Sequence, residues 1–154
     1  MNLLFDTNII LAIVRAKSGH RIMEYLNPKG AVIYVSFINI AETQSIAFQN
    51  HWGNTKMEML EDFFSSVHVI SVSHLLLPTY IGIDAYSQRN HPDYHKYPFS
   101  TPRNMGKNDL WIAATASLLN LKLVTTDRDF DHLEISFLAL QKIPQAEIQK
   151  YLEG

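Results

Sequence analysis

A chain of 154 residues is long enough to bury a substantial hydrophobic core within one domain, which we expect to span residues 1–154. The absence of cysteine excludes thiol nucleophiles, cysteine-ligated zinc and iron–sulfur clusters. The net charge of −2 argues against a uniformly basic nucleic-acid-binding surface, but residues 89–107 carry four basic residues against one acid, which leaves room for a local basic patch.

The first half of the chain alternates short apolar runs with stretches of helical periodicity. The run at residues 3–5 ends at the polar triplet Asp6-Thr7-Asn8, and apolar residues then recur at helical spacing. A turn signal at residues 27–30 precedes a β-branched run, and Ser36 follows that run as a helix cap. The elements predicted in this half are strand 3–5, a helix from residue 9, strand 32–35, helix 37–50, helix 55–65 and strand 67–71.

The second half contains a long loop between helical segments. Residues 74–90 have a helical pattern, in which Pro78 is tolerated only in the first turn or as a kink. Residues 91–107 contain three prolines and one glycine and are predicted to form a loop, which is long for a compact domain. The remaining predicted elements are helix 108–119, strand 121–126, a turn or short helix at 127–134, strand 137–140 and helix 144–153.

Short apolar strands that alternate with helices predict an α/β fold, a three-layer α/β/α sandwich around a mostly parallel central sheet. No apolar stretch is long enough to span a membrane. The N-terminal apolar run is interrupted by Asp6 and lacks the basic leader of a signal peptide. We therefore expect a cytoplasmic protein that does not associate with membranes.

Four carboxylates occupy positions that this fold would bring to one edge of the sheet. Asp6 and Asp127 directly follow predicted strands, and open parallel sheets bind ligands outside the carboxyl ends of their strands. Glu42 lies on an apolar stripe of its helix, and Asp109 lies in the first turn of its helix. Each acid taken alone has a simpler interpretation, as a helix cap, a turn residue, a partner of the helix dipole or a side chain at the edge of a stripe.

Taken together, the four carboxylates predict a metal site. Like charges about 4 Å apart repel by about 4 kcal/mol per pair at an effective dielectric near 20, so such a cluster needs cations or raised pKa values. Hard oxygen ligands select Mg²⁺ or Mn²⁺. Sites of this kind perform phosphoryl chemistry by polarising oxygens and activating water. The spacing therefore indicates a metal centre without identifying its substrate.

Four sequence blocks resemble the PIN domain family, and within it the VapC-like ribonuclease toxins of type II toxin–antitoxin systems. The blocks follow the family order over nearly the whole chain and are FDTNII at 5–10, SFINIAE at 36–42, NDLWIAATA at 108–116 and LVTTDRDF at 123–130. The resemblance implies a metal-dependent endoribonuclease that hydrolyses RNA phosphodiester bonds with Mg²⁺ or Mn²⁺ as cofactor. It also implies an antitoxin protein as partner and a homodimer.

Carried over residue by residue, the resemblance implies that the catalytic and metal-binding residues are Asp6, Glu42, Asp109 and Asp127. Three of these acids would hold the principal metal ion, while Glu42 would orient the attacking water or a second ion. The positions that match supporting residues of the family are Asn8, Thr125 and Asp129, of which the last is an additional acid.

The predicted loop at residues 91–107 is a candidate RNA contact. It interleaves Tyr94, Tyr97 and Phe99 with basic residues, a composition that can stack bases and contact phosphates. The basic candidates are Lys96, Arg103 and Lys107. The alternative interpretation is an exposed loop or one that packs in a dimer interface.

Two other functions stay open at this point. A metal-dependent phosphatase on a similar sheet would also place an aspartate after its first strand, but it usually has a second acid two residues later, where this chain has Asn8. A non-catalytic PIN-like RNA-binding module predicts degraded acidic positions, whereas all four acids are present.

Overall fold

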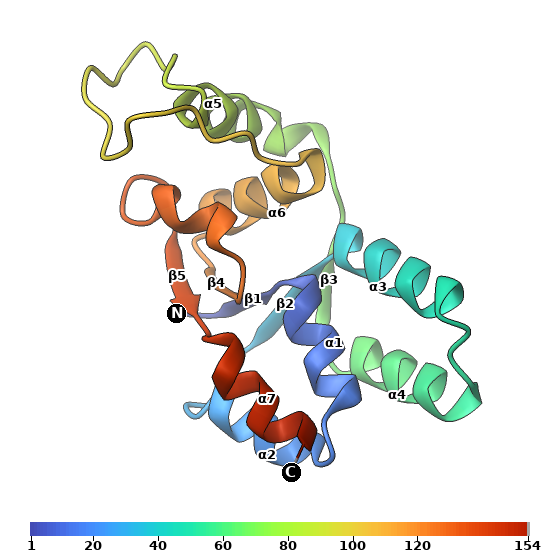
Figure 1. Ribbon diagram of the computed structural model, residues 1–154. Helices are drawn as coiled ribbons and strands as arrows, with labels where there is room; N and C mark the ends of the chain where they lie inside the picture. Colours follow the sequence, from blue (N-terminus) through green and yellow to red (C-terminus); the bar gives the residue numbers. More distant parts are fainter. Residues whose placement is uncertain (154) are drawn as a thin grey trace.

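Five strands form one sheet in which every neighbouring pair is parallel, in the order β3-β2-β1-β4-β5 (Figure 1). The structure is a computed structural model that describes residues 1–153. The strands are β1 (Leu3–Phe5), β2 (Ile33–Ser36), β3 (His68–Ile70), β4 (Lys122–Thr125) and β5 (Ala139–Lys142). The prediction of a mostly parallel central sheet is confirmed.

Helices cover both faces of the sheet because the strand residues alternate between two hydrophobic cores. Leu3 and Phe5 of β1 belong to one core, while Leu4 belongs to the other. The helices are α1 (Thr7–Arg15), α2 (Gly19–Leu26), α3 (Phe37–Gln49), α4 (Asn54–Ser65), α5 (Leu77–Ser87), α6 (Lys107–Leu118) and α7 (Gln145–Glu153), with 3₁₀ turns η1 (His74–Leu76) and η2 (Arg128–Leu133).

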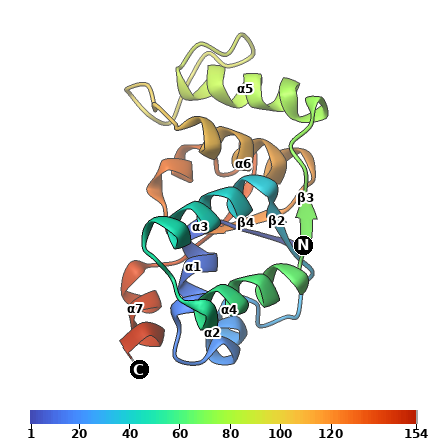
Figure 2. The ribbon, with the colours of Figure 1, turned by 90° about the vertical axis from the view of Figure 1, so that its right-hand side faces the viewer.

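The layers are clear when the molecule is turned on its side, with α5 and α6 on one face of the sheet and α1 to α4 on the other (Figure 2). This arrangement confirms the predicted three-layer α/β/α sandwich. No helix in the described part of the chain is long and apolar enough to cross a membrane.

The register of the sheet brings the carboxyl ends of β1 and β4 together. Phe5 is paired with Val124, and the backbone N–H of Asp6 donates to the carbonyl of Val124 at 3.0 Å. Because α1 and η2 begin directly after these strands, Asp6 and Asp127 leave the sheet at the same edge.

Two segments differ from the prediction. Helix α2 was not predicted, because it has only eight residues, so that its periodic pattern, with buried Ile22 and Leu26 one turn apart, extends over little more than two turns. The last strand begins at Ala139 instead of residue 137, because residues 134–138 form a tight turn in which the N–H of Phe137 donates to the carbonyl of Leu133 at 3.0 Å.

The other predicted elements agree with the structure within a few residues. The segment at 74–90 begins with η1, and Pro78 lies in the first turn of α5, where its missing N–H costs no hydrogen bond. Residues 88–106, all of which the structure describes, contain no helix or strand, so the long loop is confirmed. This loop lies beside α5 at one end of the molecule (Figure 1).

Candidate functional site

Asp6 is held at the junction of β1 and α1 by two hydrogen bonds. Its carboxylate accepts from the N–H of Thr7 at 2.8 Å through Oδ1 and from the hydroxyl of Thr125 at 2.7 Å through Oδ2. Only 5% of Asp6 is exposed, and Thr125 is fully buried at the end of β4. The Thr125 Oγ1 also accepts from the N–H of Asp127 at 3.0 Å. One hydroxyl therefore connects the ends of both central strands.

Glu42 of α3 is oriented by hydrogen bonds from two other helices. The Thr7 hydroxyl donates to its Oε1 at 2.8 Å, and the side-chain amide of Asn108 lies 3.4 Å from its Oε2. Thr7 in turn accepts from the Nδ2 of Asn39 at 3.1 Å. Asn39 is buried, and its Oδ1 accepts from the N–H of Ser36 at 2.8 Å, which closes a capping box at the start of α3. The start of α3 and the orientation of Glu42 therefore depend on the same side chains.

Asp109, Asp127 and Asp129 form the tightest group of acids. One carboxylate oxygen from each lies within 4.8 Å of the other two, and no other group of this kind occurs among residues 1–153. Asp109 projects from the first turn of α6, while Asp127 caps η2 by accepting from the N–H of Asp129 at 2.9 Å. Helix capping and metal coordination are compatible here, because a carboxylate has about four lone-pair positions.

The electrostatics of the cluster favour a cation. Burial is the main reason why the pKa of Asp6 is raised to about 6, and the charges of Glu42 and Asp127 add to it. The pKa of Asp109 is raised to about 7, again mainly by burial and then by the charges of the other acids, including Asp129. A divalent cation would relieve both effects, and an all-carboxylate donor set suits Mg²⁺ or Mn²⁺.

The structure therefore brings Asp6, Glu42, Asp109, Asp127 and Asp129 to one edge of the sheet. The carboxylate of Asp129, predicted as a supporting residue, lies in the tightest group, whereas those of Asp6 and Glu42 lie outside it.

The other sequence candidates are more dispersed. Asn8 is exposed in the first turn of α1, and its side chain makes no hydrogen bond within the described residues. Lys107 is the exposed first residue of α6, two positions before Asp109. Lys96 is exposed in the loop, and Arg103 lines a pocket beside η2.

The aromatic residues of the loop pack inward. Tyr94, Tyr97 and Phe99 surround the buried ring of Tyr86 on α5, with ring centroids 4.8, 5.2 and 5.5 Å away. Phe99 is only 6% exposed, so its ring anchors the loop and is not available to stack on a base.

Three residues of the site were not identified from the sequence. Thr7, Asn39 and Asn108 position Glu42, and each is adjacent to, or within three residues of, a recognised candidate. The Ser36-x-x-Asn39 spacing is a capping-box pattern and could have indicated Asn39. Thr7 and Asn108 carry no comparable local signal, because their contacts cross between helices.

Comparisons with known proteins match this arrangement to one family. A model of the PIN domain matches residues 3–135. Among solved structures, a chain of VapBC2 from Rickettsia felis bound to a DNA fragment from its promoter is 25% identical, with a TM-score of 0.70 over 92% of this chain and 98% of that chain. A chain of VapBC-1 from nontypeable Haemophilus influenzae is 24% identical, with a TM-score of 0.66 over 92% and 98% of the two chains.

The fold is also shared with a chain of FitAcB from Neisseria gonorrhoeae, which is 21% identical with a TM-score of 0.65 over 90% of this chain and 95% of that chain. No curated protein sequence matches this chain.

Proposed function

Because this chain belongs to the PIN domain family, we propose that it is a metal-dependent endoribonuclease that hydrolyses phosphodiester bonds of RNA, and the toxin of a type II toxin–antitoxin pair. The observation that carries this proposal is the convergence of carboxylates from α6 and η2 within 4.8 Å, beside the raised-pKa acid at the end of β1. Burial and the neighbouring carboxylates raise the pKa values of Asp6 and Asp109, so a bound cation would stabilise the cluster.

The proposed ligands of a Mg²⁺ or Mn²⁺ ion are Asp6, Asp109 and Asp127. Asp129 is proposed as a further ligand because its oxygen lies within the same group as two of them. Thr125 positions this set through its hydrogen bonds to Asp6 and to the backbone of Asp127. A bound divalent ion supplies Lewis-acid polarisation of a phosphate oxygen and neutralises the charge of the carboxylates.

Glu42 is proposed to orient the attacking water. Its two oxygens already accept from Thr7 and Asn108, which fixes the carboxylate and leaves lone pairs free for a further donor. Attack by water at phosphorus, with the 3′ oxygen as leaving group, produces a 5′-phosphate and a 3′-hydroxyl, the outcome that the family resemblance implies. Asn8 is proposed as a supporting polar residue at the exposed start of α1.

The proposed partners follow from the toxin assignment. Lys96, Arg103 and Lys107 are proposed RNA contacts on the loop and the start of α6. A small antitoxin protein would bind next to the acids and place a basic side chain among them, and the toxin would form a homodimer in the cytoplasm. Light scattering coupled to size-exclusion chromatography measures the dimer directly.

The nuclease proposal is tested with purified protein, free of any partner, incubated with end-labelled RNA and Mn²⁺. We expect cleavage that Asp109→Asn abolishes. Asp62→Asn is the matched control, because Asp62 is an exposed aspartate on α4 outside the cluster, and it should cut normally. Intact RNA with the unsubstituted protein, or equal cleavage by Asp109→Asn, would contradict the proposal.

Two further measurements separate the alternatives. Turnover of a small phosphomonoester with RNA left intact would identify a phosphatase. Absence of Mn²⁺ binding in isothermal titration calorimetry would identify a non-catalytic scaffold.

A further inference from the structure

Two of the proposed metal ligands lie on a very short element. Asp127 caps η2 and Asp129 lies in its first turn, and η2 has only six residues in 3₁₀ geometry. The hydrogen bonds of a 3₁₀ helix are poorer than those of an α-helix, so the position of η2 depends strongly on its contacts with the rest of the fold. Phe130 and Leu133 bury their side chains in the same core as α6, but apolar burial has no direction and does not fix the rotation of η2.

A hydrogen bond connects η2 to α5. The Nε2 of His132 lies 2.7 Å from the Oγ of Ser87, the last residue of α5. Ser87 has no exposed surface, and its hydroxyl also lies 3.4 Å from the Sδ of Met105 in the long loop. The imidazole of His132 contacts the ring of Phe99 edge to face, with ring centroids 5.2 Å apart. The link between His132 and Ser87 is therefore enclosed by α5 and the loop.

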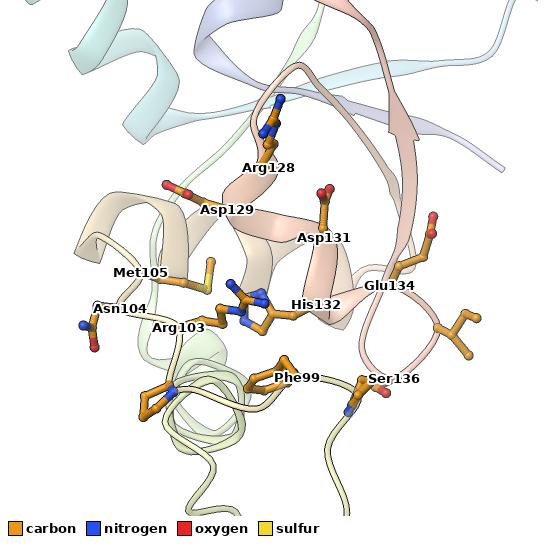
Figure 3. Close-up of a pocket in the computed structure, with 13 residues that line it drawn as sticks. Phe99, Arg103, Asn104, Met105, Arg128, Asp129, Asp131, His132, Glu134 and Ser136 are labelled. Atoms are coloured by element: carbon orange, nitrogen blue, oxygen red, sulfur yellow. The ribbon is translucent and has the colours of Figure 1, made fainter.

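The link lies on the side of η2 that carries a proposed ligand. Asp129 and His132 are three residues apart, which is one turn of a 3₁₀ helix, so their side chains lie on the same side of η2. Figure 3 shows both on that side, with the ring of His132 between Met105 and Phe99. A rotation of η2 about its axis would therefore displace the carboxylate of Asp129 and break the link to Ser87 together.

The link does not depend on charge. Burial, and then the charge of Arg103, lower the pKa of His132 to about 4, so the ring is neutral at pH 7. The ion pair that η2 makes, between Asp131 and Lys142 at 2.7 Å, joins side chains that are 54% and 34% exposed. Ion pairs with this exposure contribute little to stability. The hydrogen bond to Ser87 is therefore the better candidate for fixing the rotation of η2.

A serine that is hydrogen-bonded to a histidine is also the arrangement of a nucleophile and its base. That role needs a hydroxyl that a substrate can reach, whereas Ser87 is fully buried. A positioning role needs no access to solvent, and a hydrogen bond is stronger in such a surrounding of low dielectric. The burial of Ser87 therefore favours positioning over catalysis.

We infer that His132 and Ser87 are positioning residues that fix the rotation of η2 and so hold Asp127 and Asp129 in place for a divalent ion. The inference rests on the proposed metal site and nuclease function, and it adds two residues that contact neither the ion nor the RNA. Because Mg²⁺ requires nearly octahedral ligands at about 2.0–2.1 Å, a displacement of about 0.5 Å within the ligand set is enough to weaken binding.

The test is the affinity for Mn²⁺ alone, measured by isothermal titration calorimetry. Ser87→Ala and His132→Leu each break the link, and each should weaken Mn²⁺ binding about tenfold, the lower end of the effect of residues that orient metal ligands. The double variant should bind no more weakly than the weaker single variant, because both substitutions remove the same link. His132→Gln should retain most of the affinity, because its terminal amide can reach Ser87 in place of Nε2.

Asn27→Ala is the matched control for a loss of stability. The side chain of Asn27 makes two hydrogen bonds of 2.9 Å with the backbone of Ala31, before the start of β2 and hence at the opposite edge of the sheet from the acids. This substitution should lower the urea midpoint in EDTA about as much as Ser87→Ala, yet leave the Mn²⁺ affinity unchanged. RNA cleavage by Ser87→Ala should recover at saturating Mn²⁺, because Ser87 does not contact the substrate.

Unchanged Mn²⁺ affinity in both Ser87→Ala and His132→Leu would overturn the inference, as would losses that add in the double variant or an equal loss in Asn27→Ala. If the unsubstituted protein binds no Mn²⁺, both proposals fail. Mn²⁺ binding that depends on Ser87 and His132, without any cleavage of RNA, would refute the nuclease proposal alone. Cleavage with an Mn²⁺ affinity that neither substitution changes would refute only the positioning role.

Discussion

Replacement of Thr125 by valine removes the hydroxyl that connects Asp6 to the end of β4, with little change in side-chain shape. The Asp6 carboxylate loses a donor at 2.7 Å, and the N–H of Asp127 loses its acceptor at 3.0 Å. A hydrogen bond to a charged group contributes about 1.5–3 kcal/mol and a neutral one about 1 kcal/mol. We therefore expect the free energy of unfolding to fall by about 3 kcal/mol when Asp6 is ionised.

The cost of the valine substitution should depend on pH. The pKa of Asp6 is about 6, so its carboxyl group is ionised at pH 8 and largely protonated at pH 5. At pH 5 both lost hydrogen bonds are neutral, and the expected cost is about 2 kcal/mol. Urea unfolding in EDTA, followed by tryptophan fluorescence at both pH values, measures the difference.

Thr125→Ser is the matched control for this experiment, because serine keeps the hydroxyl and removes one methyl group. It should cost about 0.8 kcal/mol at both pH values, the contribution of one buried carbon. The reasoning would be refuted by a valine cost below about 1 kcal/mol at pH 8, or by equal costs for valine and serine.

Three further predictions follow from the same cluster. Asp109→Asn should raise the urea midpoint of metal-free protein at pH 8, because it removes a carboxylate whose pKa is raised to about 7 by its surroundings. Asp62→Asn should leave the midpoint unchanged, and a lower midpoint for Asp109→Asn would contradict this prediction. The melting temperature of metal-free protein should fall as pH rises from 5 to 8, because Asp6 and Asp109 keep protons up to about pH 6 and 7 in the folded state, whereas the unfolded chain releases them near 3.8. Saturating Mn²⁺ should remove most of that fall in a calorimetric scan. Asn39→Ala should lower the free energy of unfolding by about 1–3 kcal/mol and weaken Mn²⁺ binding in titration calorimetry. The substitution leaves the Ser36 N–H without its side-chain acceptor and removes the donor that holds Thr7 in position on Glu42. Asn50→Ala, at an exposed amide, should have neither effect.

The parts of the fold that could be predicted are those that depend on local pattern. Buried parallel strands are short apolar runs, and β1 and β4 were recognised for this reason. Since parallel strands end at a common edge, Asp6 and Asp127 could be placed together before the strand order was known. The strand order, with β1 between β2 and β4, depends on contacts between distant segments and has no local signal.

The details of the site depend on packing between helices. The hydrogen bond from Thr7 to Glu42 joins residues 35 positions apart, and it forms only because α1 packs against α3. For the aromatic residues of the loop, the sequence pattern was clear, but packing determines what their side chains can do. Their interleaving with basic residues is typical of RNA contacts, but Tyr86 provides a buried surface on which they pack. Composition identifies a segment that could contact RNA, while burial decides which of its side chains remain available.

The two acids with raised pKa values are held in different ways, and this difference would couple folding to the proposed cation binding. Asp6 accepts hydrogen bonds on both oxygens, whereas Asp109 makes no side-chain hydrogen bond within the described residues. Asp109 is therefore placed mainly by α6, and nothing but a cation or a proton offsets the charges around it. A ligand that binds only the folded chain stabilises it by RT ln(1 + [L]/Kd), about 2.7 kcal/mol at 100 times Kd. Because the carboxylates that destabilise the metal-free fold are also the proposed ligands of the ion, substitutions that strengthen the metal-free fold at Asp109 should weaken cation binding.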